Sequence, residues 1–275
     1  MLEVLTAAVL SRVGCAELAG ADALVKRPEI EFVLVGEYHG TNEMPAVARD
    51  IACAATTTGR PLVFGVELTP VDQPAIDEFM RSNGSPSARG ALLASPGWCE
   101  KGGRTTAAIV EMLETLRRLG RRNRVSVVAF DAAPTPRGTS AAREAAMAKV
   151  LKKTAAKQPG SLVVALTGAG HAGKSAWTSY DPPFAAAGQL LPPERTVALT
   201  FARPGGRYWG CSAPNGDGSR GCTAYDMPPR EPVAARGIRF DKSLRDGFDG
   251  VYSAGGRYTA SHPAVKEARK CEPSD

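Results

Sequence analysis

The sequence predicts an α/β protein with a single mixed, largely parallel sheet flanked by helices and a small Gly/Pro-rich C-terminal lobe. Two observations predict this fold class. Short, almost wholly apolar runs recur along the chain, as is typical of strands buried on both faces of a parallel sheet. Stretches with apolar residues at helical spacing separate these runs, as right-handed crossover connections require. We expect the strands near residues 32–36, 62–66, 125–130, 162–167 and 196–201.

The length of the chain suits one α/β domain. With 275 residues it can bury a large core, so we interpret residues 1–275 as a single domain. Two stretches depart from the regular alternation of strands and helices. Residues 69–123 form a mostly helical insertion, and residues 203–232, rich in Gly and Pro, form a hairpin or loop lobe.

The first strand–loop–helix unit carries two titratable side chains. The apolar run 33–36 is followed by Glu37 and His39. Residues 44–58 then show helical spacing, with Asn42 placed to cap the helix. In open α/β sheets ligands gather outside the carboxyl ends of the strands, where loops vary on a rigid support. We therefore expect Glu37 and His39 to lie at such a site.

Three later strand ends repeat this arrangement. Glu67 follows the second apolar run, Asp131 follows the third, and His171 comes shortly after the fourth. The carboxyl ends of parallel strands meet at one edge of a sheet, so these side chains should line a single cleft. The candidate catalytic residues are Glu37, His39, Glu67, Asp131 and His171.

Two arginines stand near predicted helix starts. Helices are expected at residues 105–119 and 141–156 because apolar side chains recur on one face of each, and a further one is expected at 70–80. Arg104 and Arg143 fall at the entrances of the first two, where a cation opposes the helix dipole. Each should be held by an acidic partner or by an anionic ligand. Both are candidate substrate-binding residues.

Charge and hydropathy argue against a nucleic-acid partner and against a membrane-spanning segment. The formal net charge is +6, partly from the arginine-rich stretch 117–124, which lacks the interleaved aromatic residues that stack on bases. We interpret it as a solvated helix end and expect no nucleic-acid partner. No run reaches the roughly 20 apolar residues of a membrane span. The apolar start is short and lacks a basic leading segment, so we expect a helix over residues 1–19.

Six cysteines are present, and Cys211 and Cys222 flank a loop made almost entirely of turn-forming residues. We expect a disulfide between them, worth about 3 kcal/mol in the chain-entropy picture. Such a bridge favours an extracytoplasmic location, periplasmic or secreted, over the cytoplasm. Four further cysteines could form two more bridges whose pairing the sequence leaves open: Cys15, Cys53, Cys99 and Cys271.

The strand-end motifs resemble those of a known superfamily. Gly36-Glu37-Tyr38-His39, Gly65-Val66-Glu67 and Gly168-Ala169-Gly170-His171 resemble the G-E-x-H, G-x-E and G-x-G-H signatures of the erythromycin esterase/ChaN-like superfamily, which also takes in TraB and Tiki proteins. Residues 143–148 resemble its R-D-x-x-M-A helix, and residues 248–250 with 259–261 resemble its C-terminal strand and T-A-S turn. The resemblance implies a mixed α/β fold with these motifs converging at one site. It implies no single reaction, because members include macrolide esterases, metal-dependent proteases and haem-binding lipoproteins.

The residue types themselves indicate a hydrolase that acts on an ester or amide bond of a small molecule or peptide. His39, assisted by Glu37 or Glu67, would serve as general base, and His171 would serve as the partner acid. Arg104 or Arg143 would bind a substrate carboxylate or the developing oxyanion. No G-x-S-x-G motif is present, which argues against a serine nucleophile.

Two alternatives use the same residues differently. Glu37, His39, Glu67 and His171 form a mixed nitrogen and oxygen ligand set for a divalent metal, as in a metal-dependent peptidase of the TraB/Tiki type. The chain would instead be a non-enzymatic haem- or metal-binding protein of the ChaN type if a histidine served as axial ligand. The histidines are His39, His171 and His262. The substrate, the metal requirement and the oligomeric state are left open by the sequence.

Overall fold

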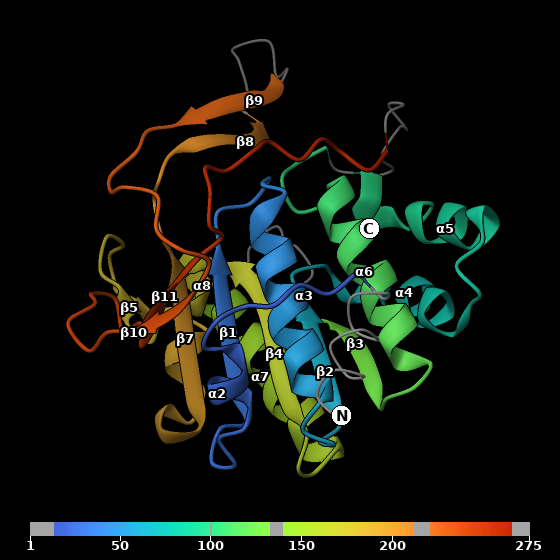
Figure 1. The fold of residues 1–275 in the computed structure, drawn as a ribbon, viewed down its shortest axis with the longest axis horizontal. Coiled ribbons are helices and arrows are strands. Elements are labelled where there is room, and N and C mark those ends of the chain that lie inside the picture. The colour runs from blue at the N-terminus through green and yellow to red at the C-terminus, as the bar shows by residue number, and fades with distance from the viewer. Residues whose placement is uncertain (1–13, 100, 133–139, 212–220, 266–275) are drawn as a thin grey trace.

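A seven-stranded sheet forms the centre of the protein in the computed structural model, which describes residues 14–99, 101–132, 140–211 and 221–265 (Figure 1). The strand order is β10-β11-β7-β1-β4-β2-β3, and the described strands of this sheet pair in parallel except β10 with β11, which are antiparallel. The mixed, largely parallel α/β fold predicted from the sequence is therefore confirmed. The strands of this sheet are β1 (Phe32–Glu37), β2 (Leu62–Val66), β3 (Val125–Ala129), β4 (Leu162–Gly168), β7 (Thr196–Phe201), β10 (Gly237–Phe240) and β11 (Gly250–Ser253).

Helices and two small hairpins make up the rest of the described chain. The α-helices are α2 (Ala21–Val25), α3 (Glu43–Thr56), α4 (Gln73–Arg81), α5 (Pro86–Leu93), α6 (Ala107–Gly120), α7 (Ser140–Lys157) and α8 (Ala169–Ala172). The 3-10 helices are η1 (Pro70–Asp72), η2 (Pro96–Cys99), η3 (Gly188–Leu190) and η4 (Pro193–Arg195). The hairpins are β5 (Ala176–Trp177) with β6 (Phe184–Ala185), and β8 (Gly206–Cys211) with β9 (Cys222–Met227).

Both faces of the sheet are covered. Val33 and Val35 of β1 belong to the core shared with α3 and α6, whereas Phe32 and Leu34 belong to the core shared with α7. Figure 1 shows α3 and α6 in front of the sheet and α7 behind it. Every residue of β1 is buried. This double burial explains why the strands read as unbroken apolar runs, since each buried Val, Leu or Phe side chain contributes about 1.5–3 kcal/mol.

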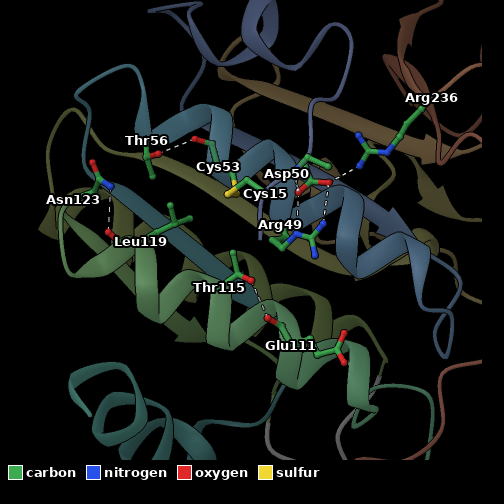
Figure 2. The surroundings of a disulfide bond; sticks show 11 residues. Cys15, Arg49, Asp50, Cys53, Thr56, Glu111, Thr115, Leu119, Asn123 and Arg236 are labelled. Atoms are coloured by element: carbon green, nitrogen blue, oxygen red, sulfur yellow. Dashed lines mark hydrogen bonds and ion pairs between the residues drawn. A yellow bond between two sulfur atoms is a disulfide. The ribbon is translucent and has the colours of Figure 1, made fainter. Parts of the chain in front are cut away.

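The N-terminal helix prediction is wrong for residues 14–19, which are not helical; residues 1–13 lie outside the described ranges. Tertiary contacts hold this segment in another conformation. Cys15 forms a disulfide with Cys53 of α3, and the backbone N–H of Ala16 donates to Asp50 Oδ1 at 3.0 Å. Figure 2 shows Arg49 and Arg236 converging on the same Asp50 carboxylate, which is buried and so needs these partners.

Asn42 does not cap α3 with its side chain. Its Nδ2 donates instead to Thr259 Oγ1 at 2.9 Å and to the carbonyl oxygen of Ala260 at 3.2 Å. The amide thereby ties the helix entrance to the C-terminal turn. The last strand, expected to begin at residue 248, begins at Gly250.

The β8–β9 hairpin confirms the predicted bridge. Cys211 lies directly opposite Cys222 in the antiparallel pair, and the two form a disulfide. The hairpin contacts the carboxyl edge of the sheet, because the N–H of Trp209 donates to the Gly40 carbonyl at 2.8 Å. Cys99 is also disulfide-bonded, and Cys271 lies outside the described ranges. Within those ranges, we find no helix with the length and apolarity needed to cross a bilayer.

The Cys15–Cys53 and Cys211–Cys222 disulfides should contribute unequally to stability. They close loops with sequence separations of 38 and 11 residues. Chain entropy predicts about 4 kcal/mol for Cys15–Cys53 and about 3 kcal/mol for Cys211–Cys222. In urea unfolding, the double variant Cys15→Ser/Cys53→Ser should therefore lose more free energy of unfolding than Cys211→Ser/Cys222→Ser. An equal or larger loss in the hairpin variant would contradict this ranking.

Candidate active site

Sheet topology brings the predicted residues together. The neighbours β1, β4, β2 and β3 all end at the same edge of the sheet. Glu37 is the last residue of β1, Glu67 follows β2, and His171 lies in α8 directly after β4. Asp131 follows β3 by two residues, and His39 lies two residues beyond Glu37. The common edge expected from the sequence is thus formed by four adjacent strands.

Glu67 occupies the middle of this cluster, with only 4% of its side chain exposed. Its Oε2 accepts hydrogen bonds from the Thr167 hydroxyl at 2.6 Å and from the Gly168 N–H at 2.7 Å. Its Oε1 accepts from Arg143 Nη2 at 3.0 Å and from Arg104 Nη1 at 3.4 Å. Burial acts to raise the pKa of Glu67, but the surrounding positive groups outweigh it and hold the pKa well below its usual value. Glu67 is therefore a carboxylate.

The two imidazoles face opposite oxygens of this carboxylate. His39 Nε2 lies 3.6 Å from Glu67 Oε2, and His171 Nε2 lies 3.9 Å from Glu67 Oε1. Gly168 separates the rings: a Cβ there would lie 3.1 Å from His39 Nε2 and 3.4 Å from His171 Cδ2. A side chain at position 168 would crowd His39 and contact the His171 ring. This close approach gives a physical reason for glycine in the motif that follows β4.

His39 is held as a cation. Its Nδ1 lies 2.8 Å from Glu37 Oε1 and its Nε2 lies 3.6 Å from Glu67 Oε2, so each ring nitrogen faces a carboxylate. Burial acts to lower the pKa of His39, but attraction to Glu67 and hydrogen bonds to Glu37 and Glu67 raise it to about 10. Solvent screens part of this attraction, since 30% of the side chain is exposed. His39 is consequently an imidazolium at neutral pH.

His171 has the opposite hydrogen-bonding pattern. Its Nδ1 lies 2.6 Å from Glu144 Oε1, and its Nε2 lies 3.1 Å from Arg143 Nη1. A guanidinium can only donate, so Nε2 must accept and the ring proton must be on Nδ1, donated to Glu144. In this arrangement the proton of the His171 ring is on Nδ1, and the Nε2 lone pair faces Arg143.

The arginines have acidic partners, one of the two options expected from the sequence. Arg143 binds Asp131 in bidentate fashion, with Nε to Oδ1 at 2.7 Å and Nη2 to Oδ2 at 2.8 Å. Arg104 Nη1 donates to Asp131 Oδ2 at 3.0 Å. Asp131 therefore braces both guanidiniums. Arg104 lies in the loop before α6, which begins at Ala107, so the helix entrance predicted at residue 105 is two residues too early.

Glu144 is a site residue that the sequence analysis missed. Its side chain is buried, and its Oε2 accepts from the Ala187 N–H at 2.8 Å while its Oε1 meets His171. The available signal was its place beside Arg143 in the segment that resembles a family motif. Helical periodicity could not show that the start of α7 lies over the end of β4.

The set predicted to hold a metal does not fit a divalent cation in this arrangement. Hydrogen-bond donors already face both oxygens of Glu67 and the Nε2 of His171. Among the described residues, no group of three or more His, Cys, Asp or Glu side chains has a geometry that could hold a metal. Haem ligation by His39 or His171 is disfavoured for the same reason, because both nitrogens of each ring face charged partners. His262 is exposed and lies against Trp209, with ring centroids 5.0 Å apart.

Comparison with solved structures shows the same fold in distant proteins. A succinoglycan biosynthesis protein aligns with 12% identity and a TM-score of 0.60, covering 87% of this chain and 91% of that protein. A Bacillus cereus protein aligns with 12% identity and a TM-score of 0.56, covering 88% and 92%. A mutant erythromycin esterase in its open conformation aligns with 9% identity and a TM-score of 0.53, covering 89% and 94%. The last belongs to the superfamily that the motifs resemble, although at this identity the likeness shows the fold alone. No protein-family model matches the sequence, and no curated protein matches it.

The charge of His39 should make stability depend on pH. Its pKa is about 10 in the folded protein, above the usual 6.5. The stabilisation is therefore complete below pH 6.5 and is lost as the pH rises through 10. Urea unfolding of the wild type and His39→Gln between pH 6 and 10 should give a stability difference that shrinks across this window. His262→Gln is the control and should show no such trend; a His39 difference that is constant with pH would contradict the assignment.

Proposed function

We propose that this protein is a hydrolase that cleaves an ester or amide bond in a small molecule or peptide. One observation carries the proposal: two imidazoles face the two oxygens of a single buried carboxylate, His39 with a carboxylate at each ring nitrogen and His171 between a carboxylate and a guanidinium. Attack of water on a carbonyl needs a base for the water proton and an acid for the leaving group. His39 and His171 can supply one of each at neutral pH.

Resting protonation favours roles opposite to those expected from the sequence, where His39 is the base and His171 the acid. His171 has an Nε2 lone pair, and Glu144 holds its other nitrogen in the donor state, as the carboxylate of a catalytic triad does. His39 carries the proton that a leaving group needs. We therefore assign His171 as general base and His39 as general acid.

The proposed reaction moves one proton through each ring. When substrate binds, its carbonyl oxygen draws Arg143 Nη1 away from His171 Nε2, while Asp131 still holds Nε and Nη2 of the guanidinium. A water in the vacated position gives its proton to His171 Nε2 while its oxygen attacks the carbonyl carbon. The tetrahedral intermediate then expels the leaving oxygen or nitrogen, which takes the proton of His39. Return of the proton from His171 to His39 through solvent restores the resting state, and water has been added across the bond.

Arg104 and Arg143 are placed to stabilise the oxyanion of that intermediate. Their side chains are 33% and 34% exposed, so a substrate oxygen can approach them, while Asp131 fixes their positions. The electrostatic support is preorganised because these charges are already paired and oriented before substrate arrives.

An oxidising location fits this proposal. Disulfides persist in the periplasm and in secreted proteins but are rare in the cytosol, and the structure has bridges at Cys15–Cys53 and Cys211–Cys222. We place the hydrolase outside the cytoplasm.

Activity should show that His39 and Glu67 act as one unit. With ethyl acetate as probe, whose alkoxide leaving group needs a proton, Glu67→Gln keeps the shape but removes the charge that holds the His39 proton. It should lower kcat/KM by about 100-fold or more, as loss of acid–base catalysis does. His39→Ala should cost a similar factor, and the double variant little more, because groups sharing one proton-transfer step are non-additive.

His262→Ala is the matched control, since His262 is exposed against Trp209 and should leave kcat/KM nearly unchanged. Circular dichroism must show that all variants are folded. Strictly additive losses at His39 and Glu67, or a larger loss at His262 than at His39, would contradict the proposed site.

A further inference from the structure

A cluster of three aromatic side chains lies beside His171. In the β5–β6 hairpin, Trp177 pairs across the strands with Phe184, and their ring centroids are 6.2 Å apart in a stacked arrangement. Tyr180, from the connection between the strands, lies 6.0 Å from Trp177 and 5.0 Å from Phe184. Trp177 also meets the His171 ring edge-on, at 5.9 Å. We call Trp177, Tyr180 and Phe184 the aromatic hairpin.

The aromatic hairpin is fixed by the same elements that position His171. A Cβ at Gly170, the residue before His171, would lie 2.1 Å from the Trp177 indole, so only glycine lets the indole lie this close. Just beyond β6, the Ala187 N–H donates to Glu144 Oε2, whose other oxygen meets His171 Nδ1. The rings are thus held in a set position relative to the proposed general base.

Core packing does not account for these rings. Tyr180 is 50% exposed, although three aromatic side chains could bury far more apolar surface inside the protein. The Trp177 Nε1–H is buried and has no hydrogen-bond partner in the described part of the chain, so the indole is not placed there for its polar group. What the hairpin offers to a ligand is aromatic ring surface beside His171.

We propose that the aromatic hairpin is a substrate subsite that binds an aromatic ring next to the scissile ester or amide bond. This inference deepens the proposed hydrolase function and rests on it, because the bound molecule is a substrate only if the protein is a hydrolase. The location of the subsite beside the proposed catalytic residues follows from the edge-on contact of Trp177 with the ring of His171. A substrate ring would contact Tyr180 and Phe184, and Trp177 links both of these rings to His171.

Binding can be measured separately from catalysis with phenylacetone, a ketone that has the aromatic ring and carbonyl but no bond to hydrolyse. NMR titration of the full wild-type chain should give at least tenfold tighter binding for phenylacetone than for acetone. Tyr180→Ala and Phe184→Leu should each weaken phenylacetone binding by about two- to tenfold, the range that one aromatic contact contributes. Tyr180→Phe, which keeps the ring, should restore wild-type affinity.

Phe240→Ala is the matched control because Phe240 is a similarly exposed aromatic residue on β10, at 44%. The proposal is overturned if Tyr180→Ala leaves phenylacetone affinity unchanged, if Phe240→Ala weakens it equally, or if acetone binds as well as phenylacetone. It is also overturned if Tyr180→Ala alters only self-association in sedimentation, which would make the hairpin an interface between copies.

Hydrolysis of ethyl phenylacetate and ethyl acetate separates the two proposals. Ring-dependent binding of phenylacetone without hydrolysis of either ester supports the subsite and contradicts the hydrolase function. Hydrolysis of both esters that depends on His39 but not on Tyr180 supports the hydrolase function and overturns the subsite. An increase in KM for ethyl phenylacetate alone in Tyr180→Ala, with kcat retained, supports both.

Discussion

The buried charge of Glu67 is the constraint on which the rest of the site depends. An ionised carboxylate away from water costs several kcal/mol unless it is paired and hydrogen-bonded. Two protein donors, Thr167 and Gly168, come from the end of the neighbouring strand, and Arg143 reaches the other oxygen from α7. Once this charge is fixed, it keeps His39 protonated. Glu67 thus connects the end of β4, the arginine Arg143 and the protonation state of His39.

The parallel sheet brings the site residues together. Strands that run in the same direction deliver the residues after their carboxyl ends to one edge, and the order β1-β4-β2-β3 sets the four contributing ends side by side. Small residues then let the functional groups approach, as at Gly168 between the two imidazoles. The imidazole rings must also be oriented. A hydrogen bond with Glu37 orients the ring of His39, and one with Glu144 orients the ring of His171. The strands thus determine where the site residues lie. The buried carboxylates of Glu37, at the end of β1, and Glu144, in α7, determine how the two imidazole rings are oriented.

Much of this architecture could be predicted because it is written in local sequence. Strands buried on both faces read as apolar runs, and Glu67 and Asp131 stand where those runs stop, so both the sheet and its polar edge were evident. The features that the sequence did not predict depend on contacts between residues that are far apart in the sequence. Residues 14–19 are not helical because Cys15 is bridged to Cys53, which is 38 residues away in the sequence. Glu144 was missed because its partner His171 is 27 residues away, and the charge of His39 emerges only when carboxylates from two strands converge on one ring.

The central claim, that His39 and His171 rest in opposite protonation states around Glu67, can be tested by ¹⁵N NMR of protein labelled in its histidine rings at pH 7.5. Nitrogen shifts distinguish protonated from unprotonated ring positions. The account predicts that His39 is protonated at both Nδ1 and Nε2, while His171 is protonated at Nδ1 alone, and that His262 behaves as a solvent-exposed reference. A neutral His39, or an imidazolium at His171, would contradict it.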